Sequence, residues 1–179
     1  SLPVITRVNK TGSNQLYSQN NFSSSLSGEL EDLGGGNFGS KVDNGEFLSY
    51  NFANNSWVVK DKKGTTYKFG VSFKARQDDP LDGSRVYQWL LEEVRDTNDN
   101  YLRYEYFKDA GAIYPSRIIY TGNGSIDGIF SVDFFREARG DVTENFKAGF
   151  KMTTNFRINR VEASVSGSWI RKYDFSYGF

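Results

Sequence analysis

Strict alternation of apolar and polar residues is the feature that most constrains this chain. In residues 66–74 every second side chain is apolar: Tyr67, Phe69, Val71 and Phe73. Side chains on a β-strand point alternately to the two faces of its sheet, so this run predicts a strand with one buried and one solvated face. A slip of one residue would put all four apolar side chains into water, and we therefore expect a firmly set register.

Residues 86–120 predict three further strands. An apolar and aromatic run ends at Asp96, the polar cluster 96–100 follows, and apolar residues then recur at every second position. A second turn at 108–111 leads into a third strand. Polar clusters between alternating runs are typical of hairpin turns in antiparallel sheet.

Aromatic side chains supply most of the expected core. The 179 residues include 15 Phe, 11 Tyr and 3 Trp, and a loose repeat of Trp-headed hairpins begins at Trp57, Trp89 and Trp169. A buried aromatic side chain removes about 150–250 Å² from water, and aromatic residues favour strands. We predict an all-β fold, an antiparallel hairpin or meander sheet of about ten to twelve strands with no convincing helix.

Composition divides the chain into two parts that we expect to form one structural unit. Residues 1–45 contain a short strand followed by a segment rich in Gly, Ser and Asn, in which only 26–33 suggests a strand. Residues 46–179 form the antiparallel region. Within it, 76–84 is predicted to be a charged surface loop and 136–145 a polar connection.

The apolar positions of the last third of the chain change parity. They fall on Phe156 and Ile158 and then on Val161, Ala163 and Val165. One inserted residue shifts the parity of a strand, so this pattern predicts a β-bulge.

Several classes of function are disfavoured by what the chain lacks. It has no His and no Cys, so it has no imidazole base, thiol nucleophile, disulfide or zinc site built from those residues. The 22 basic and 22 acidic residues cancel, which predicts no nucleic-acid partner. No apolar run is long enough to span a membrane, and residues 1–5 lack the features of a signal peptide. Because residues 177–179 stop within the rhythm of a strand, we expect a fragment of a longer protein.

Two segments resemble ligand loops and are better explained as turns. Residues 34–41 (GGGNFGSK) contain the glycines of a phosphate loop, but Ser40 precedes Lys41 and no strand-to-helix context surrounds them. Asp96, Asn98 and Asn100 have the first three spacings of an EF-hand loop, but its Gly and its closing Glu are missing. We expect an Asx-rich hairpin turn there, with a weak Ca²⁺ contact as the alternative.

Acidic and aromatic residues suggest two other functions. The acids that could act as glycosidase carboxylates are Asp78, Asp79, Asp82, Glu92 and Glu93. Such enzymes need two carboxyl groups about 5–10 Å apart in a cleft, and a solvated loop and strand edge explain these acids more simply. No G-x-S-x-G nucleophile motif occurs. Exposed Tyr and Trp rings could stack on sugars, although alternating strand positions favour core packing.

The order of the hairpins resembles a known family. Residues 57–70, which run from Trp57 through Asp61 and Gly64, are similar to a hairpin of Rhs/YD-repeat proteins, and so is the unit of residues 89–106. Residues 135–141, 146–150 and 170–173 resemble the region before the YD repeats, the plasmid-virulence-protein-B type domain shared with the B components of insecticidal Tc toxin complexes. The resemblance covers residues 1–10 and 46–179.

The chain departs from the family pattern at two positions. Asp99 stands where the family turn usually has Gly, and Gly140 stands where Pro is frequent. Gly accepts a positive φ more readily than Asp does, so the first departure leaves open whether this turn has a positive φ.

The resemblance implies a structural role. It predicts a non-enzymatic segment of a curved β-sheet shell in a large bacterial protein that is secreted or held on the cell surface. Its partners would be the rest of its own polypeptide or a toxin component, and it implies no catalytic residue, metal ligand or cofactor. The alternatives that remain open are a carbohydrate-binding β-sandwich or adhesin module and a glycoside-active enzyme.

Overall fold

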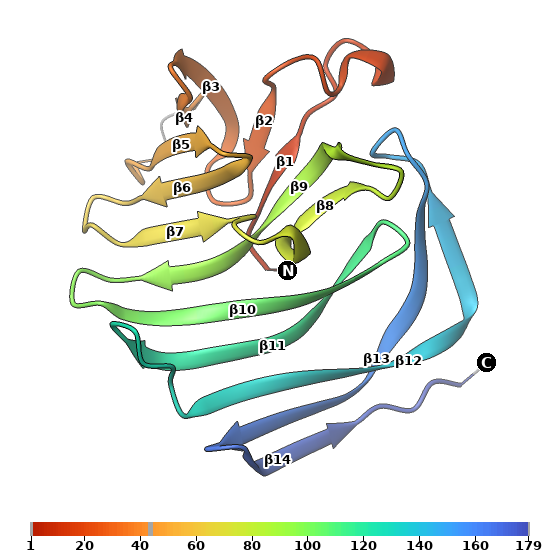
Figure 1. Cartoon of the computed structure of the whole chain (residues 1–179). Helices are drawn as coiled ribbons and strands as arrows, with labels where there is room; N and C mark the ends of the chain where they lie inside the picture. The colour runs from red at the N-terminus through yellow and green to blue at the C-terminus, as the bar shows by residue number, and fades with distance from the viewer. Residues whose placement is uncertain (1, 43–44, 179) are drawn as a thin grey trace.

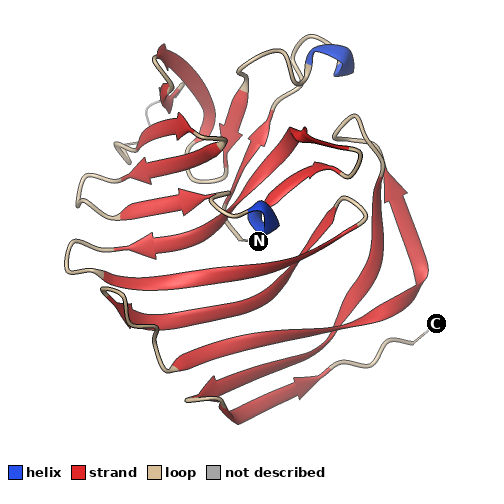
Figure 2. Ribbon diagram, viewed as in Figure 1, coloured by secondary structure: helices blue, strands red, loops and turns tan. Residues whose placement is uncertain are grey.

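The computed structural model describes residues 2–42 and 45–178. This part of the chain forms a 14-stranded antiparallel arrangement with two single-turn 3₁₀ segments, η1 (Ser13–Gln15) and η2 (Phe73–Ala75). Figure 1 shows a closed ring of short strands continued by a wide, curved sheet of long strands, and Figure 2 shows how little helix there is. The predicted all-β antiparallel fold is confirmed.

Eight strands form the closed ring. They are β1 (Val4–Arg7), β2 (Phe22–Ser24), β3 (Gly28–Gly34), β4 (Asn37–Ser40), β5 (Ser49–Ala53), β6 (Ser56–Lys60), β7 (Thr66–Phe69) and β9 (Asp82–Arg95). Each pairs with the next, and β9 also pairs with β1, where Ile5 lies opposite Trp89.

Hydrogen bonds at the middle of β9 explain how the ring closes. The Leu90 carbonyl accepts the amide of Gly70 at 2.9 Å, and the Leu91 amide donates to the carbonyl of Pro3 at 3.1 Å. Successive residues of a strand turn their amide and carbonyl groups to opposite edges. β7 and β1 therefore lie on opposite edges of β9, and the sheet becomes a barrel.

Aromatic rings fill the barrel. Trp57 and Trp89 are both fully buried, with ring centroids 6.1 Å apart and planes at 79°. Phe22 packs edge-on against both rings. The buried core cluster consists of Ile5, Phe22, Leu30, Phe38, Tyr50, Trp57, Val59, Phe69, Val86, Trp89 and Leu91. These large side chains fill the barrel interior, as is usual for a barrel of eight strands.

The strand β9 also begins the open sheet. Its last residues pair with β10 (Asn100–Asp109), and the order continues through β11 (Ala112–Asn123), β12 (Phe130–Asn145), β13 (Met152–Val165) and β14 (Ser168–Asp174). The short strand β8 (Arg76–Asp79) pairs with the first half of β9. β9 is thus shared between barrel and sheet (Figure 1).

Four predictions about strands and irregular segments are wrong. The strand predicted over 66–74 ends at Phe69, because Gly70 takes a φ of 62° and Phe73 begins η2, so Val71 and Phe73 are 52% and 64% exposed instead of buried. Residues 13–45 contain β2 and β4 in addition to the suggested strand, which is β3. Each of these strands needs only one or two apolar residues for the barrel interior, so a composition of small polar residues hides them. Residues 76–84 contain β8 and the start of β9 instead of a surface loop, and residues 136–145 are the second half of β12. The extra strands raise the count above the predicted ten to twelve.

The predicted bulge is confirmed. Phe135 lies opposite Arg160 and Arg136 lies opposite Ile158, which leaves Asn159 as the inserted residue of β13. The carbonyl of Asn159 accepts the amide of Phe175 at 2.8 Å. The inserted residue explains the change of apolar parity along the strand.

Candidate functional site

The tip of the β12–β13 hairpin folds back onto the barrel. The Tyr17 hydroxyl donates to the carbonyl of Ala148 at 2.6 Å, and Arg85 donates to the carbonyl of Gly149 at 3.1 Å. A second small core supports the contact, formed by Leu16, Tyr87, Ala148, Phe150 and Met152. We call this contact the junction.

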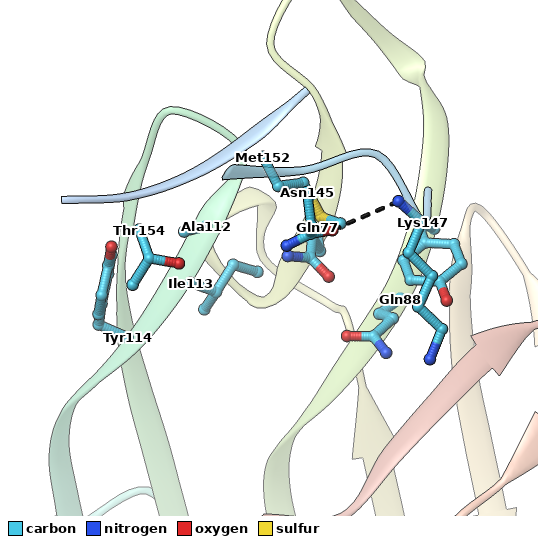
Figure 3. Close-up of a pocket in the computed structure, with 10 residues that line it drawn as sticks. Gln77, Gln88, Ala112, Ile113, Tyr114, Asn145, Lys147, Met152 and Thr154 are labelled. Carbon is cyan, nitrogen blue, oxygen red and sulfur yellow. Dashed lines mark hydrogen bonds between the residues drawn. The ribbon is translucent and has the colours of Figure 1, made fainter. Parts of the chain in front are cut away.

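A groove of about 400 Å³ lies beside the junction. Its walls come from β8, β9, β11 and the β12–β13 hairpin, and it is lined by Gln77, Tyr87, Gln88, Ala112, Ile113, Tyr114, Asn145, Lys147, Met152 and Thr154. In Figure 3, Tyr114 and Thr154 lie at one end, Gln77 near the middle, and Gln88 and Lys147 at the other end. We call it the junction groove.

Hydrogen bonds fix the amide side chains of this groove. Gln77 donates through Nε2 to the carbonyl of Gly111 at 2.9 Å, and Gln88 donates through Nε2 to the Thr6 hydroxyl at 3.0 Å. Asn145 accepts the Lys147 amide on Oδ1 at 3.3 Å, the contact dashed in Figure 3. The lining contains no carboxylate, so it lacks the pair of carboxyl groups that a typical glycosidase uses.

Two of the predicted acids are buried beside the groove. Asp78 and Asp79 are 3% and 7% exposed, so the prediction of a solvated loop is wrong for both. Lys108 contacts the Asp78 carboxylate, and Arg85 lies 2.7 Å from the carboxylate of Asp79. Burial lowers the pKa of Lys108, whose ammonium also lies over the ring of Phe73. Each acid is matched by a cation, because a buried charge without a partner is costly.

Each of the other predicted acids has its own hydrogen-bond or ion-pair partner. Glu92 accepts the amide of Ser72 at 2.8 Å. Glu93 lies 3.0 Å from Arg95 and 2.9 Å from Lys68, and the hydrogen bond from Arg95 is the main cause of its lowered pKa. Asp82 accepts hydrogen bonds from the amide and hydroxyl of Ser84. Every one of the five acids therefore has a structural partner.

The two family-like turns share one hydrogen-bond pattern. Asp96 accepts the amides of Asn98 and Asn100 on a single carboxylate oxygen, at 2.8 and 2.9 Å. Asp61 accepts the amides of Lys63 and Thr65 in the same way, at 2.8 and 3.0 Å. The interpretation of 96–100 as an Asx-rich hairpin turn is confirmed.

The third position after each acid has the left-handed conformation. Gly64 has a φ of 86° and Asp99 a φ of 62°. The positive φ of the family turn is therefore kept without glycine, which Asp tolerates better than most residues.

The glycine-rich segment 34–41 is a hairpin turn followed by β4. Gly34, Gly35 and Gly36 all have positive φ, and Lys41 lies 3.1 Å from the carboxylate of Glu29. No helix follows the turn, so the geometry of a phosphate loop is not formed. In the described ranges 2–42 and 45–178, no three or more acidic side chains gather as metal ligands, and no helix has the length and apolar character to cross a membrane.

Comparisons with known proteins agree with the hairpin order. Residues 46–121 match the family model described as Salmonella virulence plasmid 65kDa B protein, SpvB. Residues 46–121 are therefore similar to that family. The resemblance to the plasmid-virulence-B and Tc toxin type is thereby confirmed. A search of curated protein sequences found no match.

Solved structures share the fold at low sequence identity. The N-terminal domain of effector protein SpvB from Salmonella typhimurium strain LT2 superposes with a TM-score of 0.78 at 16% identity, over 91% of this chain and 75% of that one. The TcdB2-TccC3-Cdc42 structure gives a TM-score of 0.72 at 15% identity over 91% of this chain. The Photorhabdus luminescens Tc holotoxin pore gives 0.70 at 16% over 90%. The alignment with this chain covers 11% of each of these two Tc chains.

Exposed aromatic residues gather on and after β14. Trp169, Tyr173 and Tyr177 are 63%, 52% and 43% exposed, whereas Trp57 and Trp89 are fully buried. The expectation that aromatic residues form the core therefore applies to the barrel and not to β14.

Sequence reasoning missed the junction groove. Its residues come from five separate stretches of the chain, and the tip of the β12–β13 hairpin must fold back before they meet. The one available signal is the 146–150 segment, where two Phe residues flank Ala148 and Gly149 in an otherwise polar connection. Apolar residues at a hairpin tip indicate that the tip is covered; Phe150 is buried at the junction, whereas Phe146 is 64% exposed.

Proposed function

We propose that this SpvB-type domain is a non-catalytic scaffold of a secreted or cell-surface bacterial toxin-related protein. It would hold the rest of its own polypeptide, or a partner toxin component, against its open sheet and contribute to an enclosing shell. One observation carries the proposal: the sheet β10–β14 has an apolar face and an open edge.

Register places the apolar residues on one face. Phe130 lies opposite Val165, Val132 opposite Ala163, and Phe134 opposite Val161, which is followed by Tyr173 on β14. Cross-strand neighbours share a face of the sheet. Burial of the first six is intermediate, and Tyr173 is 52% exposed. An apolar face this exposed suits contact with further polypeptide.

The opposite face carries ion pairs. Arg117 pairs with Asp133, Arg160 with Glu162, and Lys172 with Asp174. Asp133 lies opposite Glu162, which places both on the face away from Val132. A sheet with one charged and one apolar face can separate water from an interior, as a shell wall does.

The edge of β14 supports the same role. Within the described residues, β14 pairs only with β13, so its second edge offers free amide and carbonyl groups. Exposed sheet edges recruit further strands. The partnered acids support the absence of catalysis, because each candidate carboxylate already serves an ion pair or a turn.

A crosslinking experiment tests the proposal. A photo-crosslinking phenylalanine analogue replaces Tyr173 in the full-length polypeptide, which is expressed with and without a candidate toxin component. We expect crosslinks from this position to polypeptide outside residues 1–179. The control position is Leu81, which is 97% exposed and lies far from β14 in sequence. Equal yields at the two positions would contradict a scaffold role for the open sheet.

A further inference from the structure

The junction groove contains a Tyr hydroxyl group with no protein partner. Tyr87 is 5% exposed, and its hydroxyl makes no hydrogen bond with any residue in the described part of the chain. The oxygen is not sealed in the core, because it is absent from the buried unpartnered atoms and Tyr87 lines the groove. The Tyr87 hydroxyl is therefore free to donate a hydrogen bond to a ligand in the groove, and to accept one from it.

Other polar groups of the groove have atoms that can still donate or accept a hydrogen bond. The Tyr114 hydroxyl accepts the amides of Asn155 and Phe156 at 3.0 and 3.3 Å, so its own hydrogen remains to be donated. Gln77 and Gln88 use Nε2 within the protein and keep Oε1 as an acceptor. The groove therefore offers donors and acceptors side by side, all of them uncharged.

Charge narrows the class of ligand. The lining has no carboxylate, which disfavours a cation, and its only charged group is Lys147 at one end. A single exposed lysine is a weak anchor for an anion compared with an arginine cluster. A neutral molecule with many hydroxyl groups, each able to donate and accept, matches the mixed lining.

The apolar lining and the volume agree with a sugar. Ala112, Met152 and the ring of Tyr114 are buried beside the groove and offer carbon surface for the C–H face of a sugar ring. A volume of about 400 Å³ lies within the range of small-ligand sites. An added peptide strand fits less well, because Pro115 on β11 has no amide hydrogen and its carbonyl already accepts from Arg136.

We propose that the junction groove binds a short neutral oligosaccharide. The proposal is independent of the scaffold role, since it uses the junction and not β14. The Tyr87 hydroxyl, the Tyr114 hydroxyl and the oxygens of Gln77 and Gln88 bind sugar hydroxyl groups.

The test is a glycan array of neutral and acidic sugars, followed by calorimetry with the array's best neutral trisaccharide. Tyr87→Phe keeps the ring and removes the unpartnered hydroxyl, and we expect affinity to fall about five- to tenfold with the melting temperature unchanged. Lys147→Ala should change affinity less than twofold. Trp169→Ala, on the exposed aromatic edge, should leave binding intact.

Three results would overturn the proposal. The first is no binding to any array glycan at millimolar concentration. The second is binding that survives Tyr87→Phe and is lost with Trp169→Ala, which would move the site to β14. The third is a preference for acidic glycans that Lys147→Ala abolishes.

Discussion

At the scale of the residue, the two Asx turns are equivalent although one has Gly64 and the other Asp99 at the left-handed position. A Cβ on Gly64 would lie 2.7 Å from Cγ2 of Thr97, and a φ of 86° is unfavourable for alanine. We expect Gly64→Ala to lower the free energy of unfolding by about 1–2 kcal/mol. Asp99→Gly should leave it unchanged or slightly raised. Urea denaturation measures both, and equal losses would argue against the shared turn geometry.

The pKa of the Asp96 carboxylate should depend on the hydrogen bonds of its turn. The hydrogen bond from the Asn100 side chain is the main reason that the pKa of Asp96 lies below its ordinary value of 3.8. A lowered pKa means that the carboxylate stabilises the fold above its ordinary pKa, and that this contribution is lost as the pH falls below it. Carbon-detected NMR should show the pKa of Asp96 moving upward in Asn100→Ala. An unchanged pKa would show that the Asn100 side chain does not cause the shift.

The two buried tryptophans should differ in their response to substitution. Nε1 of Trp89 donates to the carbonyl of Asn55 at 3.0 Å, whereas Nε1 of Trp57 has no hydrogen-bond partner among the described residues. Trp57→Phe removes a buried unpartnered group, and Trp89→Phe leaves an acceptor unpaired. We expect Trp57→Phe to be less destabilising by about 1 kcal/mol. Thermal unfolding measures the stability of the two variants. A larger loss of stability in Trp57→Phe than in Trp89→Phe would contradict the assigned hydrogen bonding.

The role of a residue could be predicted from the sequence where its hydrogen-bond partners are close to it in the chain. The turn role of Asp96 follows from its own neighbours in sequence. The burial of Asp78 does not, because its cation, Lys108, lies 30 residues along the chain. A charged stretch such as 76–84 therefore looks solvated until its partners are known.

At the scale of the element, the β12–β13 hairpin tip should open when its link to the barrel is cut. Tyr17→Phe removes the hydrogen bond to Ala148, which should cost about 0.5–1.5 kcal/mol. We expect faster amide exchange in residues 146–153 and unchanged exchange in the barrel. Tyr177→Phe is the matched control, because the Tyr177 hydroxyl also donates to a carbonyl, that of Ile158, away from the tip. Faster exchange throughout the chain in Tyr17→Phe would contradict a local clasp.

Elements were predictable where alternation and turn signals agree. The hairpins after Asp61 and Asp96 and the bulge at Asn159 follow from the spacing of residues, whereas the strand predicted over 66–74 ends at Phe69, where Gly70 turns the chain toward η2. β2 has only three residues and one large apolar side chain, Phe22, so no period can be measured in it. β12 extends through 136–145 with charged residues on both faces, and residues 136–138 and 143–145 pair with β13 on either side of an irregular stretch.

At the scale of the whole molecule, the barrel should be more stable than the open sheet. The barrel interior is filled by fully buried rings, whereas β14 is exposed along its entire length. Amide protection follows burial and local packing. Hydrogen exchange measured by mass spectrometry should therefore show the slowest amides in β6, β7 and the middle of β9, with β14 exchanging fastest. Uniform protection from β1 to β14 would contradict a separate barrel core.

Ring closure could not be predicted from the sequence. Thr6 of β1 contacts Gln88 of β9 at a separation of 82 residues, and neither strand carries a local signal that selects the other. The hairpin rhythm predicts neighbours along the chain and leaves open whether the first strand returns to a later one. The junction groove was hidden for the same reason.

The position of β9 has a consequence for synthesis on the ribosome. Every strand of the barrel lies within the first 95 residues, so the barrel can close once this segment has left the exit tunnel. The free edge at the end of β9 is then a template, and β10 through β14 can add to it in the order in which they are translated. The nascent chain never has to hold an early strand unpaired while it waits for a distant partner beyond residue 95. In the unfinished polypeptide the barrel strands are thus already paired, and the end of β9 is the edge that β10 will cover.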